Sequence, residues 1–314
     1  MITELHRHLD ASIRLSTLHE LALEKGIEKK GTTLEALKEK IILSRPLKNL
    51  TEVLARFDIF QKVLDSKEVI EKISFQALED CAREGTNQIE FRFSPSFLCE
   101  KNGLSWEEGL KSVVSGLKKA SAQYPDMKWG LICIASRDYG EESVSQTVEF
   151  FLKYRSDFIG FDLAGNENRY PCRLFENAFK PLVLAQVPIT IHAGEDSGPE
   201  NVWEAIELLG AKRIGHGISS VRDPQLLTYL RDKQICLEVC PTSNFITQAV
   251  TSLEAHPLKS MIKAEVPVCI NTDDPGVFGN TLPGEFKICI NNIGLSSNEL
   301  EFCKRSANLA TFIN

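Results

Sequence analysis

The sequence predicts a single (β/α)8 barrel with a helical insertion after the first strand. From residue 67 onward, segments with helical periodicity alternate with short apolar runs that read as buried strands. No Gly/Ser-rich linker interrupts this alternation, and a chain of 314 residues is long enough for one closed barrel. With 43% hydrophobic and 25% charged residues, the composition is that of an ordinary globular protein.

The first strand is expected at residues 2–6 and runs into the cluster His6-Arg7-His8-Leu9-Asp10. Residues 11–66 then form the helical insertion, with helices expected at 16–25, 34–43 and 51–64, the first of them capped by Ser16. Because the insertion follows the end of a strand, we expect it to form a lid or wall over the strand ends.

The alternation after the insertion supplies the other seven strands. They are expected at residues 88–94, 128–135, 158–163, 187–192, 213–216, 235–239 and 266–271. The helices that precede them are expected at 67–84, 105–124, 141–154, 173–184, 200–208, 224–232 and 257–264. Two helices close the chain at 282–292 and 297–312, and Ser296 with Glu299 forms a capping box at the last one.

Charge and cysteine usage exclude several functional classes. A net charge of −7 gives no long-range attraction to nucleic acid or to an anionic membrane. The apolar runs are too short to span a bilayer, and the N-terminus lacks the pattern of a signal peptide. The nine cysteines include no CxxC pair, and several lie within apolar runs as reduced, buried thiols do. We therefore expect a cytoplasmic protein without nucleic-acid or membrane partners.

The stretch His192-Ala193-Gly194-Glu195 places a possible metal ligand beside a possible proton donor, at the end of a predicted strand. A barrel enzyme carries its chemistry at the carboxyl ends of its strands. Four of the six histidines lie at such ends, together with several carboxylates. The full set at the predicted strand ends is His6, His8, Asp10, Asp162, Gly165, Glu167, His192, Glu195, His216, Asp273 and Asp274.

Imidazoles and carboxylates together are the ligands of a catalytic zinc site, which keeps a position for water. His6 and His8 point the same way on a strand, and His192 and Asp273 can complete the set. A metal lowers the pKa of water from about 15.7 towards 7. His216 can then orient that water or accept its proton, while Glu195, near an apolar strand end, is free to protonate the substrate.

Each of these features also has a structural interpretation. A His-x-His pair can be two ordinary surface histidines, and His216 can be a hydrogen-bonded core histidine, although its flanking glycines argue for open space around the ring. Asp273 and Asp274 can belong to a turn before Pro275. Two adjacent carboxylates on a buried strand end repel each other, however, unless a cation or hydrogen-bond donors hold them.

Six motifs together resemble the adenosine deaminase family of the amidohydrolase superfamily. They are His6-Arg7-His8-Leu9-Asp10, Asp162-Leu163-Ala164-Gly165, His192-Ala193-Gly194-Glu195, Gly215-His216-Gly217, Cys240-Pro241-Thr242-Ser243-Asn244 and Asn271-Thr272-Asp273-Asp274-Pro275. The resemblance spans residues 4 to about 312. It implies one zinc on His6, His8, His192 and Asp273, with Glu195 as the proton shuttle to purine N1 and His216 as the partner of the attacking hydroxide. It further implies a purine nucleoside as the small-molecule partner and substrate contacts from Asp10, Gly165, Asp274 and His8.

The residue that bears on substrate choice is Asp10. The resemblance associates Asp here with adenosine and its 5′-hydroxyl, Glu with adenine or aminodeoxyfutalosine, and Asn with N6-methyl-AMP. A carboxylate also repels a 5′-phosphate. Many family members have Gly after this Asp, whereas this chain has Ala11. We expect hydrolytic deamination of adenosine, and of 2′-deoxyadenosine, to inosine and ammonia in purine salvage, with a related aminopurine such as adenine or a 5′-modified adenosine as the alternative.

Two other functions remain open at this point. A different hydrolase on the same metal barrel would more often carry a second metal and a bridging Lys on the fourth strand, where this chain has Phe161-Asp162-Leu163-Ala164. A non-catalytic binding protein would be expected to have lost a ligand or Glu195, and none is missing.

Overall fold

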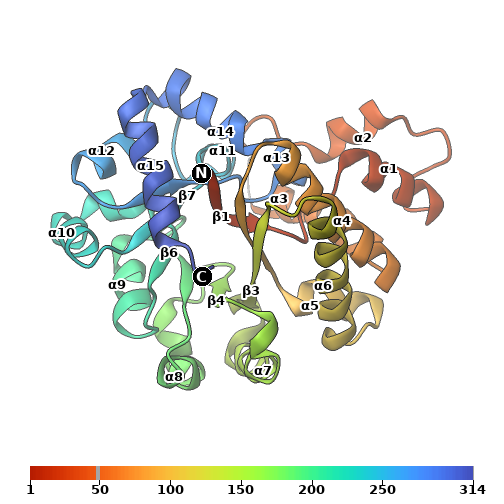
Figure 1. The fold of residues 1–314 in the computed structure, drawn as a ribbon, viewed down its shortest axis with the longest axis horizontal. Coiled ribbons are helices and arrows are strands. Elements are labelled where there is room, and N and C mark those ends of the chain that lie inside the picture. The colour runs from red at the N-terminus through yellow and green to blue at the C-terminus, as the bar shows by residue number, and fades with distance from the viewer. Residues whose placement is uncertain (47–49, 314) are drawn as a thin grey trace.

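The computed structural model describes residues 1–46 and 50–313. Within them the chain forms a barrel of parallel strands surrounded by helices (Figure 1). The strands are β1 (Thr3–His8), β2 (Gln88–Phe93), β3 (Lys128–Ser136), β4 (Gly160–Ala164), β5 (Thr190–Ala193), β6 (Arg213–His216), β7 (Cys236–Val239) and β8 (Val268–Ile270). The predicted barrel class is confirmed.

The barrel consists of two four-stranded halves that meet at two seams. The halves run β1-β2-β3-β4 and β5-β6-β7-β8, with every pairing parallel. At one seam Phe161 pairs with Ile189, and at the other Arg7 pairs with Asp273. The second seam is held by His8 N–H, which donates to the Asp273 carbonyl at 2.8 Å. The seam that closes the barrel therefore runs through two of the predicted metal ligands.

Helices follow the strands around the outside of the barrel (Figure 1). They are α1 (Leu15–Glu24), α2 (Leu34–Ile41), α3 (Leu50–Val63), α4 (Lys67–Arg83), α5 (Pro95–Cys99), α6 (Trp106–Gln123), α7 (Gly140–Lys153), α8 (Glu176–Leu184), α9 (Pro199–Glu207), α10 (Pro224–Asp232), α11 (Pro241–Ile246), α12 (Leu258–Lys263), α13 (Pro275–Phe278), α14 (Leu282–Ile288) and α15 (Ser297–Ala310). The predicted capping box at Ser296 and Glu299 is present.

The sequence missed three short helices and misplaced one cap. The helices α5, α11 and α13 follow strands β2, β7 and β8, and each begins with a proline. Proline suits the first helical position because its missing N–H has no intrahelical acceptor there. The residue that caps α1 is Arg14, without a side-chain bond, rather than the predicted Ser16. Helix 173–184 is shorter than predicted because residues 172–175 form a 3-10 turn.

The barrel interior contains a buried layer of charges that the apolar pattern did not predict. Arg92 donates to Asp162 at 2.8 Å and to Glu238 at 2.7 Å, and all three side chains are fully buried. Arg213 donates to Glu238 and Glu90, each at 2.6 Å, and lies 3.6 Å from the ring centroid of Phe312. This network ties the C-terminal segment to strands β2, β6 and β7 beneath the rim.

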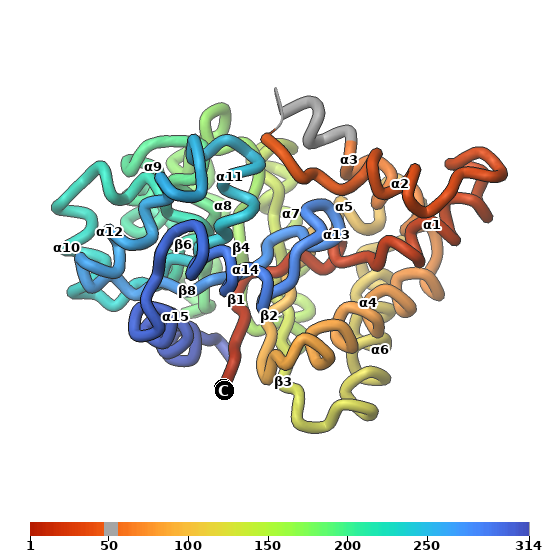
Figure 2. The backbone as a smooth tube through the Cα atoms, turned by 90° about the horizontal axis from the view of Figure 1, so that it is seen from above, coloured from red at the N-terminus to blue at the C-terminus, as the bar shows by residue number. Residues whose placement is uncertain are grey.

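The insertion packs against segments that follow strand ends. Leu43 N–H donates to the Val277 carbonyl of α13 at 2.9 Å, and Gln61 Nε2 donates to the Phe97 carbonyl of α5 at 3.0 Å. Figure 2 shows α1, α2 and α3 on the same side of the barrel as α13. Residues 47–49, which belong to the predicted insertion 11–66, lie outside the described residues.

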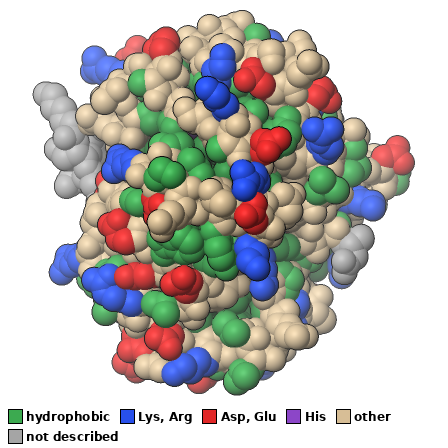
Figure 3. Space-filling model, turned by 90° about the vertical axis from the view of Figure 1, so that its left-hand side faces the viewer, with side chains coloured by type: hydrophobic (Ala, Val, Ile, Leu, Met, Phe, Trp, Pro, Cys, Tyr) green, Lys and Arg blue, Asp and Glu red, His purple; other side chains and the backbone are tan. Residues whose placement is uncertain are grey.

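The outer surface carries charges of both signs. On the face shown in Figure 3, acidic and basic side chains alternate, with hydrophobic side chains between them. Within residues 1–46 and 50–313, no helix combines the length and the apolar content required to cross a membrane. All nine cysteines are free and buried.

Candidate metal and active site

Four imidazoles meet at the carboxyl-terminal rim of the barrel. His6 and His8 come from β1, His192 from β5 and His216 from the end of β6. The ring centroid of His6 lies 4.6 Å from that of His192, 5.0 Å from that of His216 and 5.4 Å from that of His8. The fold thus brings together the four histidines that the sequence placed at strand ends.

Asp273 completes this cluster from the segment after β8. Its Oδ1 lies 3.1 Å from His6 Nε2 and 3.3 Å from His8 Nε2, and its Oδ2 lies 3.9 Å from His216 Nε2. Asp273 and His216 both have left-handed backbones, with φ of 68° and 59°. Such strain in residues other than glycine is concentrated at functional sites. The alternative interpretation of Asp273 as part of a turn fits its backbone, but its carboxylate faces the imidazoles.

The other ring nitrogens of two imidazoles are held by buried carboxylates. Glu238 Oε2 lies 2.9 Å from His6 Nδ1, and Asp162 Oδ2 lies 3.0 Å from His192 Nδ1. A carboxylate behind a histidine fixes the ring so that its second nitrogen can bind a metal. Burial opposes ionisation, yet the neighbouring Arg92 and Arg213 hold the pKa of Glu238 well below its usual value. Burial also lowers the pKa of His192 to about 3, which keeps this ring neutral.

The donor atoms fit a bound cation. The candidate ligand groups are His6, His192, His216 and Asp273, and beside them His8, Asp273 and Asp274, and in each group the donor atoms lie within 4.8 Å of one another. His6 Nε2 is buried and makes no hydrogen bond, although it lies 3.1 Å from a carboxylate oxygen. A buried polar atom without a partner, aimed at such a cluster, is what an absent metal would explain. The two groups together contain six side chains, the four ligands that the sequence proposed and, in addition, His216 and Asp274.

Glu195 lies at the edge of the histidine cluster, beside His216. Its Oε2 is 3.5 Å from His216 Nε2, and its Oε1 accepts from Thr247 Oγ1 at 3.2 Å. Burial raises the pKa of Glu195, and the carboxylates of Asp273 and Glu167 raise it further. A raised pKa is what a glutamic acid needs in order to act as a general acid.

The loop that carries Glu195 is organised around the buried carboxylate of Glu167. Glu167 Oε1 accepts from the backbone N–H groups of Glu195, Asp196 and Ser197 at 2.7, 2.6 and 3.2 Å. Its Oε2 accepts from Gly194 N–H at 2.7 Å and from Ser197 Oγ at 2.6 Å. Four successive backbone donors on one carboxylate form an anion-binding nest, here occupied by a side chain of the same protein. Glu167 therefore sets the direction in which Glu195 leaves the backbone.

Three further residues that the sequence predicted for the site are Asp274, Asp10 and Gly165. Asp274 is buried, and burial together with the charge of Asp273 raises its pKa well above the usual value. Asp10 is 6% exposed, accepts from Ser94 N–H at 3.3 Å, and has its pKa raised by burial. Gly165 has φ of 111°, and a Cβ there would collide with the Asp138 carboxylate.

Sequence reasoning missed several residues that act behind the rim. Asn244 Nδ2 lies 3.0 Å from His216 Nδ1, and His256 Nε2 lies 3.3 Å from Asn244 Oδ1. Glu238 and Arg92 lie within strands, where an apolar pattern draws attention away from single charges. The sequence could have indicated them, because a charged residue inside a buried strand is almost always paired with an opposite charge.

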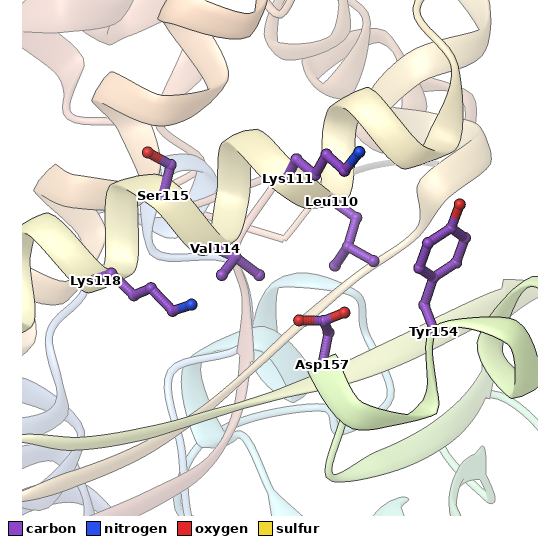
Figure 4. Close-up of a pocket in the computed structure, with 7 residues that line it drawn as sticks. All are labelled: Leu110, Lys111, Val114, Ser115, Lys118, Tyr154 and Asp157. Carbon is purple, nitrogen blue, oxygen red and sulfur yellow. The ribbon is translucent and has the colours of Figure 1, made fainter.

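A separate hollow lies on the outer wall of the barrel, away from these residues. It has a volume of about 430 Å³ and is lined by residues of α6 and of the segment after α7, including Lys111, Lys118 and Asp157 (Figure 4). None of the rim histidines or carboxylates lines it. The chemistry therefore belongs to the rim rather than to this hollow.

A (β/α)8 barrel with imidazoles and carboxylates converging on its carboxyl-terminal rim defines the class of metal-dependent barrel hydrolases. The comparisons with known sequences make this class specific. The sequence model of the adenosine deaminase family matches residues 2–314. The adenosine deaminase of Shewanella loihica is 35% identical over 313 residues, covering 100% of this chain and 94% of its own. That of Klebsiella pneumoniae is 37% identical over 299 residues, covering 95% and 90%. The chain belongs to the adenosine deaminase family.

Solved structures agree in fold and extend over other aminopurines. The adenine deaminase of Arthrobacter aurescens has a TM-score of 0.91 and 26% identity, covering 100% of this chain and 94% of its own. The N6-methyl-AMP deaminase of Arabidopsis thaliana has a TM-score of 0.84 and 28% identity, covering 100% and 92%. The family therefore fixes the kind of reaction more tightly than the substrate.

Proposed function

We propose that this protein is a zinc-dependent adenosine deaminase that converts adenosine, and 2′-deoxyadenosine, to inosine and ammonia in purine salvage. The observation that carries the proposal is the juxtaposition of a metal-ligand cluster with a half-buried glutamic acid of raised pKa, Glu195, 3.5 Å from His216. The curated relatives that match along nearly the whole chain are named adenosine deaminases. We place the enzyme in a reducing cytoplasm because its nine cysteines are free.

His6, His8, His192 and Asp273 would hold the metal. When bound, zinc lowers the pKa of water and so supplies a nucleophile at neutral pH. Glu238 and Asp162 orient the rings of His6 and His192 from behind. Neutral imidazoles are the form that binds metal, and burial favours this form by lowering the pKa of both His6 and His192.

Glu195 is the proton donor of the proposed mechanism. Water adds to C6 of the purine while Glu195 delivers its proton to N1, so that the ring accepts the new C–O bond without a build-up of negative charge. The C6–N bond then breaks, and the amine takes a proton from the new hydroxyl and leaves as ammonia. The proton that water lost restores Glu195, and the product keeps its proton on N1. General acid catalysis of this kind contributes about 10²- to 10⁴-fold.

Asp274, Gly165, Asp10 and His8 orient the nucleoside. Purine N7 carries only a lone pair, so in this proposal Asp274 contacts it as a protonated carboxyl donor, a form that its raised pKa favours. In this proposal the backbone N–H of Gly165 contacts N3, Asp10 binds the 5′-hydroxyl, and His8 contacts the purine nucleoside. Asp10 is assigned to the sugar end in this proposal, and its carboxylate would repel a 5′-phosphate, which favours adenosine over AMP.

The helices α1, α2 and α3 form a lid over the site in this proposal. The support is their packing on α5 and α13, the segments that follow strands β2 and β8. Gly276 of α13 donates to the Ala11 carbonyl at 2.8 Å, immediately after Asp10. A cover of this kind excludes water other than the nucleophile.

The test is an ultraviolet assay with adenosine, 2′-deoxyadenosine, adenine, N6-methyl-AMP and AMP, run on protein whose metal content has been measured. We expect kcat/KM to be greatest with adenosine or deoxyadenosine. A preference for adenine or for a 5′-phosphorylated substrate would assign the alternative aminopurine function. Hydrolysis of amides or phosphoesters without any deamination would overturn the reaction class.

A further inference from the structure

We propose that Asn244 and His256 are positioning residues that hold His216 in the tautomer with its proton on Nε2. His216 then faces the reacting groups as a hydrogen-bond donor. The tautomer follows from the hydrogen bonds of the structure alone, whereas its consequence for turnover rests on the proposed function. The inference decides between the two roles that the sequence left open for His216, orienting water or accepting its proton.

The chain of bonds begins at a backbone amide, which can only donate. Leu258 N–H points at His256 Nδ1 over 3.1 Å. This nitrogen must therefore offer a lone pair, so a neutral His256 carries its proton on Nε2. His256 is 4% exposed, and burial lowers its pKa to about 4. His256 is consequently a neutral imidazole with a known tautomer.

The next bond fixes the side-chain amide of Asn244, in helix α11. His256 Nε2–H donates to Asn244 Oδ1 at 3.3 Å. The Asn244 oxygen faces His256, so its NH2 group faces His216 Nδ1 at 3.0 Å. Asn244 is fully buried, and water does not compete for either bond.

The last bond assigns His216. Because the NH2 group of Asn244 donates, Nδ1 of His216 accepts, and the proton of the neutral ring lies on Nε2. That nitrogen faces two carboxylate oxygens, Glu195 Oε2 at 3.5 Å and Asp273 Oδ2 at 3.9 Å. An N–H group at this position can donate to either oxygen. The tautomer is therefore assigned by the bond at Nδ1, and the groups that face Nε2 are compatible with it.

The opposite tautomer cannot be reached by one local change. A proton on His216 Nδ1 would require the Asn244 amide to flip, which turns its NH2 group towards His256. The proton of His256 would then have to move to Nδ1, directly against Leu258 N–H. Two buried donors would face each other without an acceptor, which is costly in a protein interior.

This arrangement defines what His216 does in the reaction. With Nε2 protonated, His216 donates a hydrogen bond to the oxygen that adds to C6 and holds it beside Glu195. The proton that water releases returns to the Glu195 carboxylate, which has given its own to N1. Each proton is accounted for without His216 serving as the base.

The test measures the tautomer directly. Full-length protein with ¹⁵N-labelled histidine is examined by long-range ¹H–¹⁵N correlation, first without metal and then with Zn²⁺ added. The His216 signals are identified by their loss in His216→Gln. We expect a protonated Nε2 and an unprotonated Nδ1 in both samples. A protonated Nδ1 with a bare Nε2 in the wild-type protein would overturn the proposal, and this result requires no variant to fold.

Asn244→Asp is the informative variant because it has the same shape but only acceptors. His256 can still donate to it, while His216 must now place a proton on Nδ1. We expect the Nδ1 signal to become protonated and turnover of adenosine to fall by up to about 10⁴-fold, as a wrong tautomer does in a serine protease. The matched control is Asn177→Asp, the same change at an exposed position of α8, which should alter neither. A wild-type spectrum in Asn244→Asp would contradict the proposal.

His256→Gln and His256→Phe give a second, independent comparison. Gln can still donate to Asn244 and should keep the wild-type spectrum, whereas Phe frees the amide and should give a mixture of His216 tautomers. Identical spectra for the two variants would exclude a role for His256. Correct tautomers in a protein that does not deaminate adenosine would defeat the proposed function and leave this inference standing. Deamination of adenosine by a protein whose His216 carries its proton on Nδ1 would overturn this inference and leave the proposed function standing.

Discussion

Replacing Glu167 by Gln should both destabilise the protein and misplace Glu195. Gln is isosteric, but it has one oxygen where Glu has two. If that oxygen replaces Oε1, the new NH2 group takes the place of Oε2. It then faces Gly194 N–H, which in the wild-type protein donates to Oε2 at 2.7 Å. The hydroxyl of Ser197 can rotate to accept, whereas the backbone N–H cannot.

The magnitude follows from these bonds. One buried N–H left without an acceptor costs about 2 kcal/mol. The three remaining backbone bonds lose their charge, and each weakens by about 0.7 kcal/mol because bonds to charged groups contribute roughly twice as much as neutral ones. The sum is about 4 kcal/mol. Glu167 is only 4% exposed, so solvent screens little of this loss.

Urea denaturation of metal-free protein measures the first effect, and steady-state kinetics with adenosine measure the second. We expect the free energy of unfolding to fall by about 4 kcal/mol. We expect kcat to fall by about 100-fold, because a displaced catalytic group costs that much, while zinc content stays at one per chain. The control is Glu207→Gln, an exposed residue of α9, which should change neither quantity. A loss of stability below about 1 kcal/mol with normal kcat would refute the reasoning.

The remaining predictions concern Glu195, Asp10 and His256. Glu195→Gln should retain zinc but lose about 10²- to 10⁴-fold in kcat, and near-normal turnover would remove Glu195 from the mechanism. Asp10→Ala should reduce kcat/KM for adenosine far more than for adenine, and equal losses would show that Asp10 does not contact the sugar. Because burial lowers the folded-state pKa of His256 to about 4, the unfolded chain binds a proton first as pH falls. His256 should therefore contribute a loss of about 2 kcal/mol in stability between pH 7 and pH 5 in metal-free protein, and the total loss should be smaller by that amount in His256→Gln. An equal loss in both proteins would mean that His256 is not neutral in the folded state.

Most of the barrel was predictable because the local sequence pattern of each long helix and each strand indicates its type. The predicted strand 213–216 and helix 224–232 coincide with β6 and α10. The short helices α5, α11 and α13 were missed because four to six residues give too little periodicity, although a proline opens each one. Ser16 is not the N-cap because the helix already begins at Leu15, which places Ser16 inside its first turn.

The rim was predictable for a different reason. Strand ends in a barrel all face one rim, so polar residues at those ends converge without knowledge of the loops. His256 could not be found in this way, because its path to His216 runs through Asn244 and depends on the packing of α11 against the following loop. The sequence placed Glu167 near a strand end, but no sequence pattern indicates that its carboxylate accepts hydrogen bonds from four backbone N–H groups.

The central claim is that the rim histidines and Asp273 hold a metal on which adenosine deamination depends. The most direct measurement is the ultraviolet-monitored conversion of adenosine to inosine by protein that holds one zinc per chain, repeated after chelation and after zinc is restored. The account predicts that chelation abolishes turnover and that zinc returns it in proportion to occupancy. Turnover that persists without metal, or zinc-replete protein that leaves adenosine unchanged, would contradict it.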